Sequence, residues 1–129
     1  MANAVLVDSS FFIARHRKGL DPFAELAAAD PWEPVTCGMV MLEVLRGAHP
    51  GRDYAHYRAA FEVMTCIPTT SQIWMSATDL LRKLARQGFT IPPQDALIAA
   101  SALAIDAPVL TLDAHFKLVP DLVTLDSLP

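Results

Sequence analysis

Four acidic residues, far apart in the chain, each end or interrupt an apolar segment: Asp8, Glu43, Asp95 and Asp113. Two of them directly follow short apolar runs, one lies inside an apolar segment, and one opens an alanine-rich segment. If the fold brings them together, their oxygens form the kind of ligand set that Mg²⁺ and Mn²⁺ accept. The sequence therefore indicates a divalent-metal site.

Each acid also has a simpler structural explanation. Asp8 and Asp113 could cap the helical segments that follow them, although their shared position after predicted strands favours a site for the pair. Asp95, in the first turn of a predicted helix, gains from the helix dipole. Glu43 is hardest to explain in this way, because its helix is apolar almost all round. Arg46, three residues later, is its candidate counter-charge.

Length and composition indicate one domain, residues 1–129, with 53% hydrophobic residues and enough apolar material for a sizeable core. A formal net charge of −4 argues against nucleic-acid binding by the whole surface. No apolar stretch approaches the ~20 residues that cross a bilayer, and no signal peptide is recognisable, so we expect a cytoplasmic protein without membrane association. Cys37 and Cys66 lie in apolar segments, and we expect both to be reduced and buried.

Short apolar segments alternate with helical patterns, which predicts a parallel α/β sheet covered by helices on both faces. The expected strands are 4–7 at the centre, 35–37, 65–68, 109–112 and 122–125. The expected helices are 9–18, 39–46, 53–64, 94–105 and a short turn at 113–118. One more helix, ended by Gly88, is expected to bury Trp74, Ala77, Leu81, Leu84 and Ala85. Short helices and turns are expected around Gly19, Pro22, Pro31 and Pro34.

Other chemistries have less support in the sequence. The chain has four histidines: His16, His49, His56 and His115. None forms a pair at zinc-ligand spacing, so we expect surface or capping roles for them. Ser9 and Ser10 do not lie in a nucleophile elbow, and glycine-rich phosphate loops are absent. A metal-dependent phosphatase with a nucleophilic Asp8 is an alternative, but such enzymes commonly have a second Asp where this chain has Ser10.

Four segments resemble, in order, those of PIN-domain ribonucleases, and the likeness is strongest to the VapC toxins of bacterial toxin–antitoxin pairs. They are residues 5–10, 41–47, 94–100 and 110–116. The resemblance spans almost the whole chain. It implies a three-layer α/β/α domain with a central parallel sheet, usually a homodimer, that cleaves RNA as a Mg²⁺- or Mn²⁺-dependent hydrolase and has a cognate antitoxin. A non-catalytic PIN-like binding module is the alternative from another class.

Carried over by position, the resemblance implies an acidic catalytic set of Asp8, Glu43, Asp95 and Asp113. Asp8, Asp95 and Asp113 would hold the metal, and Glu43 would orient or deprotonate the attacking water. Ser9 and Thr111 would be supporting hydroxyls. RNA contacts are expected from Arg15, Arg17, Lys18 and Arg46, for which a solvated helix face is the alternative. One departure is that His115 and Lys117 stand in a turn where some relatives carry a further acid.

Overall fold

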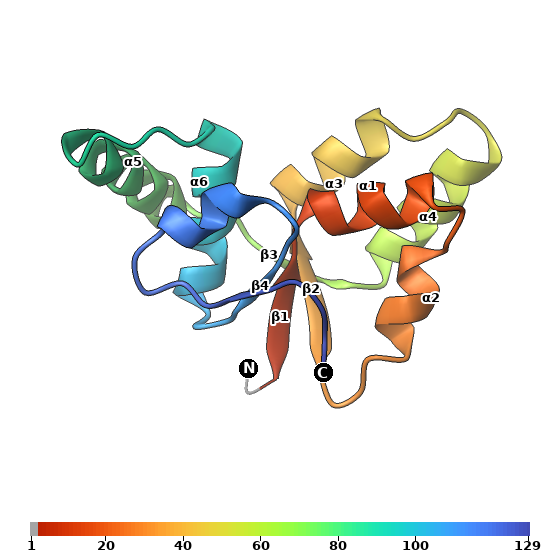
Figure 1. Cartoon of the computed structure of the whole chain (residues 1–129). Coiled ribbons are helices and arrows are strands. Elements are labelled where there is room, and N and C mark those ends of the chain that lie inside the picture. Colours follow the sequence, from red (N-terminus) through yellow and green to blue (C-terminus); the bar gives the residue numbers. More distant parts are fainter. Residues whose placement is uncertain (1–2) are drawn as a thin grey trace.

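A computed structural model describes residues 3–129, in which helices cover both faces of one five-stranded sheet (Figure 1). The strands are β1 (Ala4–Val7), β2 (Glu33–Cys37), β3 (Thr65–Ile67), β4 (Val109–Leu110) and β5 (Thr124–Leu125). Every neighbouring pair is parallel, and the strand order is β3-β2-β1-β4-β5. The predicted α/β architecture, with β1 at its centre, is confirmed.

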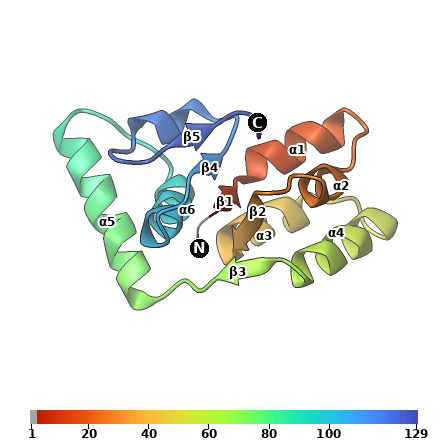
Figure 2. The same cartoon turned by 90° about the horizontal axis from the view of Figure 1, so that it is seen from below.

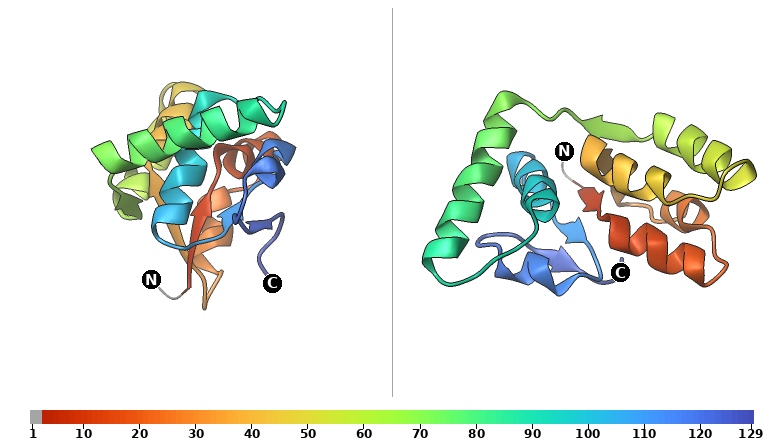
Figure 3. Two further views of the ribbon diagram at one scale, coloured as in Figure 1. Left: turned by 90° about the vertical axis from the view of Figure 1, so that its left-hand side faces the viewer. Right: turned by 90° about the horizontal axis from the view of Figure 1, so that it is seen from above.

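The helices form the two outer layers. They are α1 (Ser9–Arg17), α2 (Pro22–Ala27), α3 (Gly38–Arg46), α4 (Arg52–Glu62), α5 (Ser71–Arg86), α6 (Pro93–Ala104) and the 3-10 helix η1 (Ala114–Leu118). Figures 2 and 3 show α1 to α4 on one side of the sheet and α5 and α6 on the other. Across residues 3–129, none of the helices combines the length and hydropathy required to span a bilayer.

The order in which successive strands are added to the sheet changes direction at β1, so that β4 lies on the opposite side of β1 from β2. Strands β1, β2 and β3 run in sequence toward one edge, whereas β4 and β5 lie on the other side of β1. The Asp8 amide, just beyond β1, donates to the Leu110 carbonyl at 2.9 Å, which holds the two strand ends together. In an open parallel sheet, the loops that diverge at such a reversal leave a crevice beyond the carboxyl ends of the strands.

The core lies on both faces of β1, whose four residues are all buried. Phe12 of α1 is fully buried and packs against the rings of Phe23 and Phe61, at centroid separations of 5.1 and 5.2 Å. On the other face, α6 is buried continuously from Asp95 to Ala102, and its many alanines allow close packing. The two sides of the core therefore fix the starts of α1 and α6, which both carry candidate site residues.

Two predictions about burial are wrong. Trp74 and Ala85 of α5 are exposed, and Ile73 takes the buried place beside Ala77 and Leu84. Because α5 packs chiefly on α6, one narrow stripe meets the core and the rest of its broad apolar surface stays outside. Cys37 and Cys66 are free thiols as predicted, but Cys66 is exposed, because β3 is the edge strand and has a neighbour on one side only.

Strand β2 begins at Glu33, earlier than predicted, and so includes Pro34. Proline lacks the amide donor that a central strand requires, and its presence argues against a strand with two neighbours. Here Pro34 pairs with β1 only, because β3 starts opposite Val35. Strands β4 and β5 are two residues each, shorter than the predicted segments 109–112 and 122–125.

Candidate metal centre

Asp8 connects the end of β1 to the start of α1. Its Oδ2 accepts hydrogen bonds from the Ser10 hydroxyl at 2.7 Å, the Thr111 hydroxyl at 2.9 Å and the Ser10 amide at 3.4 Å. The amide bond makes Asp8 the N-cap of α1, the structural role considered for it above. Its Oδ1 receives, within residues 3–129, only a 3.5 Å bond from Ser9, which leaves it free to accept further partners. The cap and a ligand role are therefore compatible.

Ser10 and Thr111 form a hydroxyl bridge between the start of α1 and the loop after β4. Their oxygens lie 3.2 Å apart. The Leu112 amide donates to the Ser10 hydroxyl at 2.9 Å, and the Asp113 amide donates to the Thr111 hydroxyl at 3.0 Å. Thr111 was predicted as a supporting hydroxyl, whereas Ser10 was not, because nothing in the sequence distinguishes it from any serine in a first helical turn. The hydroxyl bridge positions Asp8 and Asp113 relative to each other.

Glu43 lies half-buried on α3 and accepts a hydrogen bond from the Ser9 hydroxyl at 3.3 Å. The considered pair with Arg46 does not form: no ion pair to Glu43 is present within residues 3–129. Burial raises the pKa of the Glu43 carboxyl, and the negative charges of Asp8 and Asp95 raise it further, against the opposing effects of the Ser9 bond and Arg46. Ser9 thus contacts both Asp8 and Glu43.

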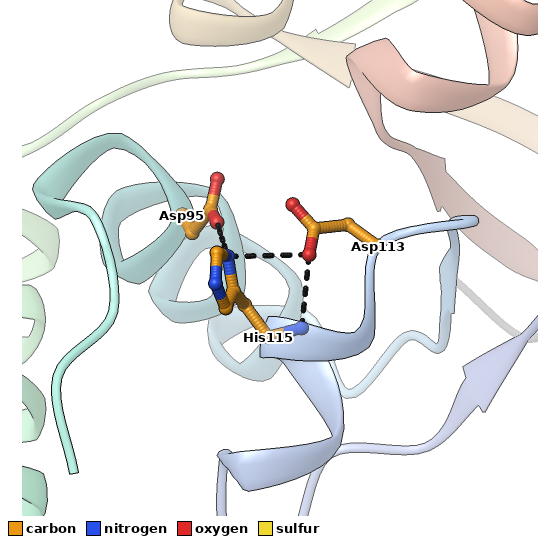
Figure 4. Close-up of side chains that lie close together, drawn as sticks. All are labelled: Asp95, Asp113 and His115. Atoms are coloured by element: carbon orange, nitrogen blue, oxygen red, sulfur yellow. Dashed lines mark hydrogen bonds and ion pairs between the residues drawn. The ribbon is translucent and has the colours of Figure 1, made fainter.

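Asp95, Asp113 and His115 come together from two segments, the start of α6 and the turn that leads into η1 (Figure 4). Asp95 lies in the first turn of α6 and is 7% exposed, while Asp113 caps η1 by accepting from the His115 amide at 2.9 Å. The Nδ1 atom of His115 lies 3.1 Å from Asp95 Oδ2 and 3.2 Å from Asp113 Oδ1. His115 is exposed, as expected, but its ring also contacts two of the acids. One feature of the sequence indicated this contact: His115 lies two residues after Asp113, in the turn where some relatives carry a further acid.

The four acids form one electrostatic unit. Burial raises the pKa of Asp95 to about 6, and the charges of Asp113 and Asp8 add to the increase, although the hydrogen bond from His115 opposes it. None of the four carboxylates forms an ion pair with a lysine or arginine in the described part of the chain. Clustered carboxylates without a lysine or arginine partner are a donor set that a divalent cation accepts, so these residues fit Mg²⁺ or Mn²⁺.

The predicted RNA-binding side chains differ in whether they are already bonded to another residue and in which surface they line. Arg15 donates two hydrogen bonds to Glu25, at 3.0 and 3.2 Å, and its guanidinium lies 4.4 Å from the ring centroid of Phe11. Arg17 and Arg46 line a cavity of about 500 Å³ that also reaches Glu43. Lys18, the C-cap of α1, is exposed. Arg17 and Arg46 therefore share a cavity with Glu43, whereas the guanidinium of Arg15 is occupied by Glu25.

A family model described as PIN domain matches residues 5–122. Solved structures with a similar fold include VapBC2 from Rickettsia felis bound to a promoter DNA fragment, with a TM-score of 0.75 and 19% identity over 95% of this chain and 97% of that chain. For VapBC-1 from nontypeable Haemophilus influenzae the TM-score is 0.73, with 21% identity over 95% of this chain and 96% of that one. For VapC20 of Mycobacterium tuberculosis, a sarcin–ricin loop cleaving toxin, the TM-score is 0.68, with 20% identity over 88% of this chain and 92% of that one. No curated protein matches the sequence.

Proposed function

This chain belongs to the PIN-domain family, and from that premise we propose that it is a metal-dependent endoribonuclease that hydrolyses RNA phosphodiester bonds. The observation that carries the proposal is the mutual charge repulsion that links Asp8, Glu43, Asp95 and Asp113 near the reversal of strand order, with no lysine or arginine paired to them within residues 3–129. The proposed nuclease domain takes in the whole chain, residues 1–129.

The carboxylates of Asp8, Asp95 and Asp113 would hold the Mg²⁺ or Mn²⁺ ion. A divalent ion bound there stabilises the charge that develops on the phosphate and makes water a better nucleophile. Ser9, Ser10 and Thr111 keep the carboxylate of Asp8 in place through the hydrogen bonds already described. Glu43 is the proposed proton acceptor for the attacking water, because its raised pKa makes it a better base than an ordinary carboxylate.

Arg17, Lys18 and Arg46 are the proposed contacts to the RNA backbone, with Arg15 available only if it releases Glu25. Their positive charge on one side of the acids would attract phosphates that the acids themselves repel. In a chain with a net charge of −4, such a local basic region would offset the repulsion of RNA by the rest of the surface.

The test is cleavage of fluorescently labelled RNA oligonucleotides by the purified chain, with Mg²⁺ or Mn²⁺ and with excess EDTA. We expect internal cleavage with either ion and none with EDTA, restored when the ion is resupplied. A chain that binds RNA without cutting it under any of these conditions is a non-catalytic binding module. A chain that instead releases phosphate from a monoester such as p-nitrophenyl phosphate is a phosphatase.

We further propose that the protein acts in the cytoplasm as the toxin of a toxin–antitoxin pair, with a cognate antitoxin as its partner. The support is the likeness in fold to chains of VapBC assemblies. Induced expression of the native chain should arrest growth, and expression of the Asp8→Asn variant should not. If a small protein is encoded next to it, co-expression of that protein should restore growth. Identical growth with both versions of the chain would rule the toxin role out.

We also propose a homodimer that forms through an apolar groove of about 400 Å³, lined in part by Leu42, Trp74 and Leu97. Leu42 of α3 and Trp74 of α5 are 56% and 55% exposed, and because they line the same groove they leave apolar surface that a second copy can cover. The Trp74→Lys variant should weaken dimerisation at least about tenfold by removing apolar contact area. Sedimentation equilibrium measures this, with Val63→Lys as the exposed-apolar control that should leave the dimer unchanged.

Thr111→Val should weaken Mg²⁺ binding about tenfold, since residues that orient a metal ligand typically contribute that much or more. Valine keeps the volume of the side chain but removes the hydroxyl that donates to Asp8 and accepts from the Asp113 amide. Isothermal titration calorimetry gives the affinity, and Thr124→Val on β5 serves as the matched control. Unchanged Mg²⁺ affinity in Thr111→Val would show that the hydroxyl bridge does not orient the ligands.

A further inference from the structure

His115 is the residue of the site that the proposed function leaves unassigned. Its ring comes from η1, in the turn that also carries Asp113, and its Nδ1 atom lies between Asp95 Oδ2 and Asp113 Oδ1 (Figure 4). The side chain is 47% exposed, so the core does not force the ring into this position. The backbone of His115 is fixed separately, by the hydrogen bond from its amide to Asp113.

The spacing of these three atoms suits an octahedral ion. Two adjacent ligands of an octahedral ion, each at ~2.1 Å, lie roughly 3.0 Å apart. The Nδ1 atom of His115 is 3.1 Å from one carboxylate oxygen and 3.2 Å from the other, and one ligand atom from each residue falls within 4.8 Å of the others. A single ion can therefore contact all three without rearrangement of the backbone.

We propose that His115 is a nitrogen ligand of the metal and makes the site prefer Mn²⁺ to Mg²⁺; this inference rests on the proposed metal-dependent function. Mg²⁺ is a hard cation that takes oxygen ligands and keeps several waters. First-row transition ions accept imidazole nitrogen more readily, and an acid at the same position would offer only oxygen. The histidine in the turn after Asp113 is thus the specificity-determining residue for the metal.

The test compares the native chain with His115→Gln, which removes the imidazole, and His115→Asp, which supplies oxygen instead. Mn²⁺ affinity is measured by electron paramagnetic resonance of free Mn²⁺, and Mg²⁺ affinity by competition. We expect His115→Gln to weaken Mn²⁺ binding about tenfold and Mg²⁺ binding less than about twofold. His115→Asp should lower the ratio of Mn²⁺ to Mg²⁺ affinity by a similar factor. The matched control is His56→Gln, which disrupts an exposed histidine–aspartate pair with Asp21.

Pulsed electron paramagnetic resonance adds a direct readout, since a bound imidazole gives a ¹⁴N coupling to Mn²⁺. The coupling should be present in the native chain and in His56→Gln, and absent in His115→Gln. Bound Mn²⁺ without a nitrogen coupling, equal weakening of both ions, or no Mn²⁺ binding at all would overturn the assignment. Cleavage of RNA without a nitrogen coupling would refute the ligand role alone, whereas a coupling without cleavage would refute the nuclease function alone.

Discussion

Replacing Asp95 with Asn is expected to lower the rate of metal-dependent RNA cleavage at least about a thousandfold, and to stabilise the metal-free protein. A metal ion at a phosphodiester contributes several kcal/mol to the transition state, and each 1.36 kcal/mol is a factor of ten. The amide of Asn keeps the size of the side chain but supplies a much poorer metal ligand. Single-turnover cleavage of a labelled RNA measures the loss, and Asp8→Asn should lose activity to the same extent.

The gain in stability follows from the same carboxylate. Folding raises the pKa of Asp95 from 3.8 to about 6, so the ionised form is disfavoured in the folded chain. Above pH 6 this costs stability, and the cost falls steadily as the pH drops from 6 to 4, because the carboxyl is by then protonated in the folded chain and increasingly so in the unfolded chain. Asp95→Asn should therefore raise the free energy of unfolding by up to about 2 kcal/mol at pH 7.5 and by little at pH 4.

Urea unfolding at the two pH values, without metal, gives this difference. Asp106→Asn is the matched control, because Asp106 is an exposed acid just beyond the other end of α6. We expect that variant to cleave RNA normally and to show no comparable pH-dependent gain. Native cleavage by Asp95→Asn would remove Asp95 from the proposed site, and a loss of stability at pH 7.5 would mean that the cluster does not strain the metal-free fold.

The second large effect is a loss of cleavage in acid. Protonation of Asp95, whose pKa is about 6, removes a metal ligand, so it alone should lower activity roughly thirtyfold between pH 7.5 and 4.5 when the metal is below saturation. Burial and the charge of Asp8 also raise the pKa of Glu43, whose protonation removes the proposed base. The combined fall should exceed that from Asp95 alone, with a steeper slope than one ionisation produces.

Cleavage rates across this pH range, at low and at saturating Mg²⁺, check the prediction. The ion competes with protons for the same oxygens, so saturating Mg²⁺ should move the midpoint to lower pH. Circular dichroism at each pH establishes that the chain stays folded. A profile that is flat down to pH 5 at low Mg²⁺ would contradict the proposed ligation by Asp95.

The positions of the acids could be predicted because each depends on a local pattern. Asp8 follows the apolar run of β1 and so lies at the carboxyl edge of the sheet, and Asp95 follows the prolines that start α6, the helix that leads into the neighbouring parallel strand β4. The sequence also predicted the order and type of nearly all elements. The exposure of Trp74 was not predicted, because the apolar residues of α5 cover a wider arc of the helix than its main neighbour, α6, buries.

The contacts of His115 and Ser10 could not be predicted in this way. Both depend on which partner a polar side chain reaches across the fold, and that choice leaves no periodic signal. Ser10 meets Thr111 from 101 residues away, and His115 meets Asp95 from 20 residues away. For Glu43, the local pattern suggested Arg46, but the hydroxyl of Ser9, from a different helix, is the partner that forms.

The hydroxyl bridge between Ser10 and Thr111 also bears on when activity can first arise during protein synthesis. Asp8 leaves the ribosome early, but its oxygens are held by a residue made 103 positions later, and Asp113 follows after that. Until β4 has emerged and docked beside β1, the growing chain has no complete set of carboxylates. A ribosome-bound nascent chain that ends before β4 should therefore be unable to cut RNA, including the ribosomal RNA around it.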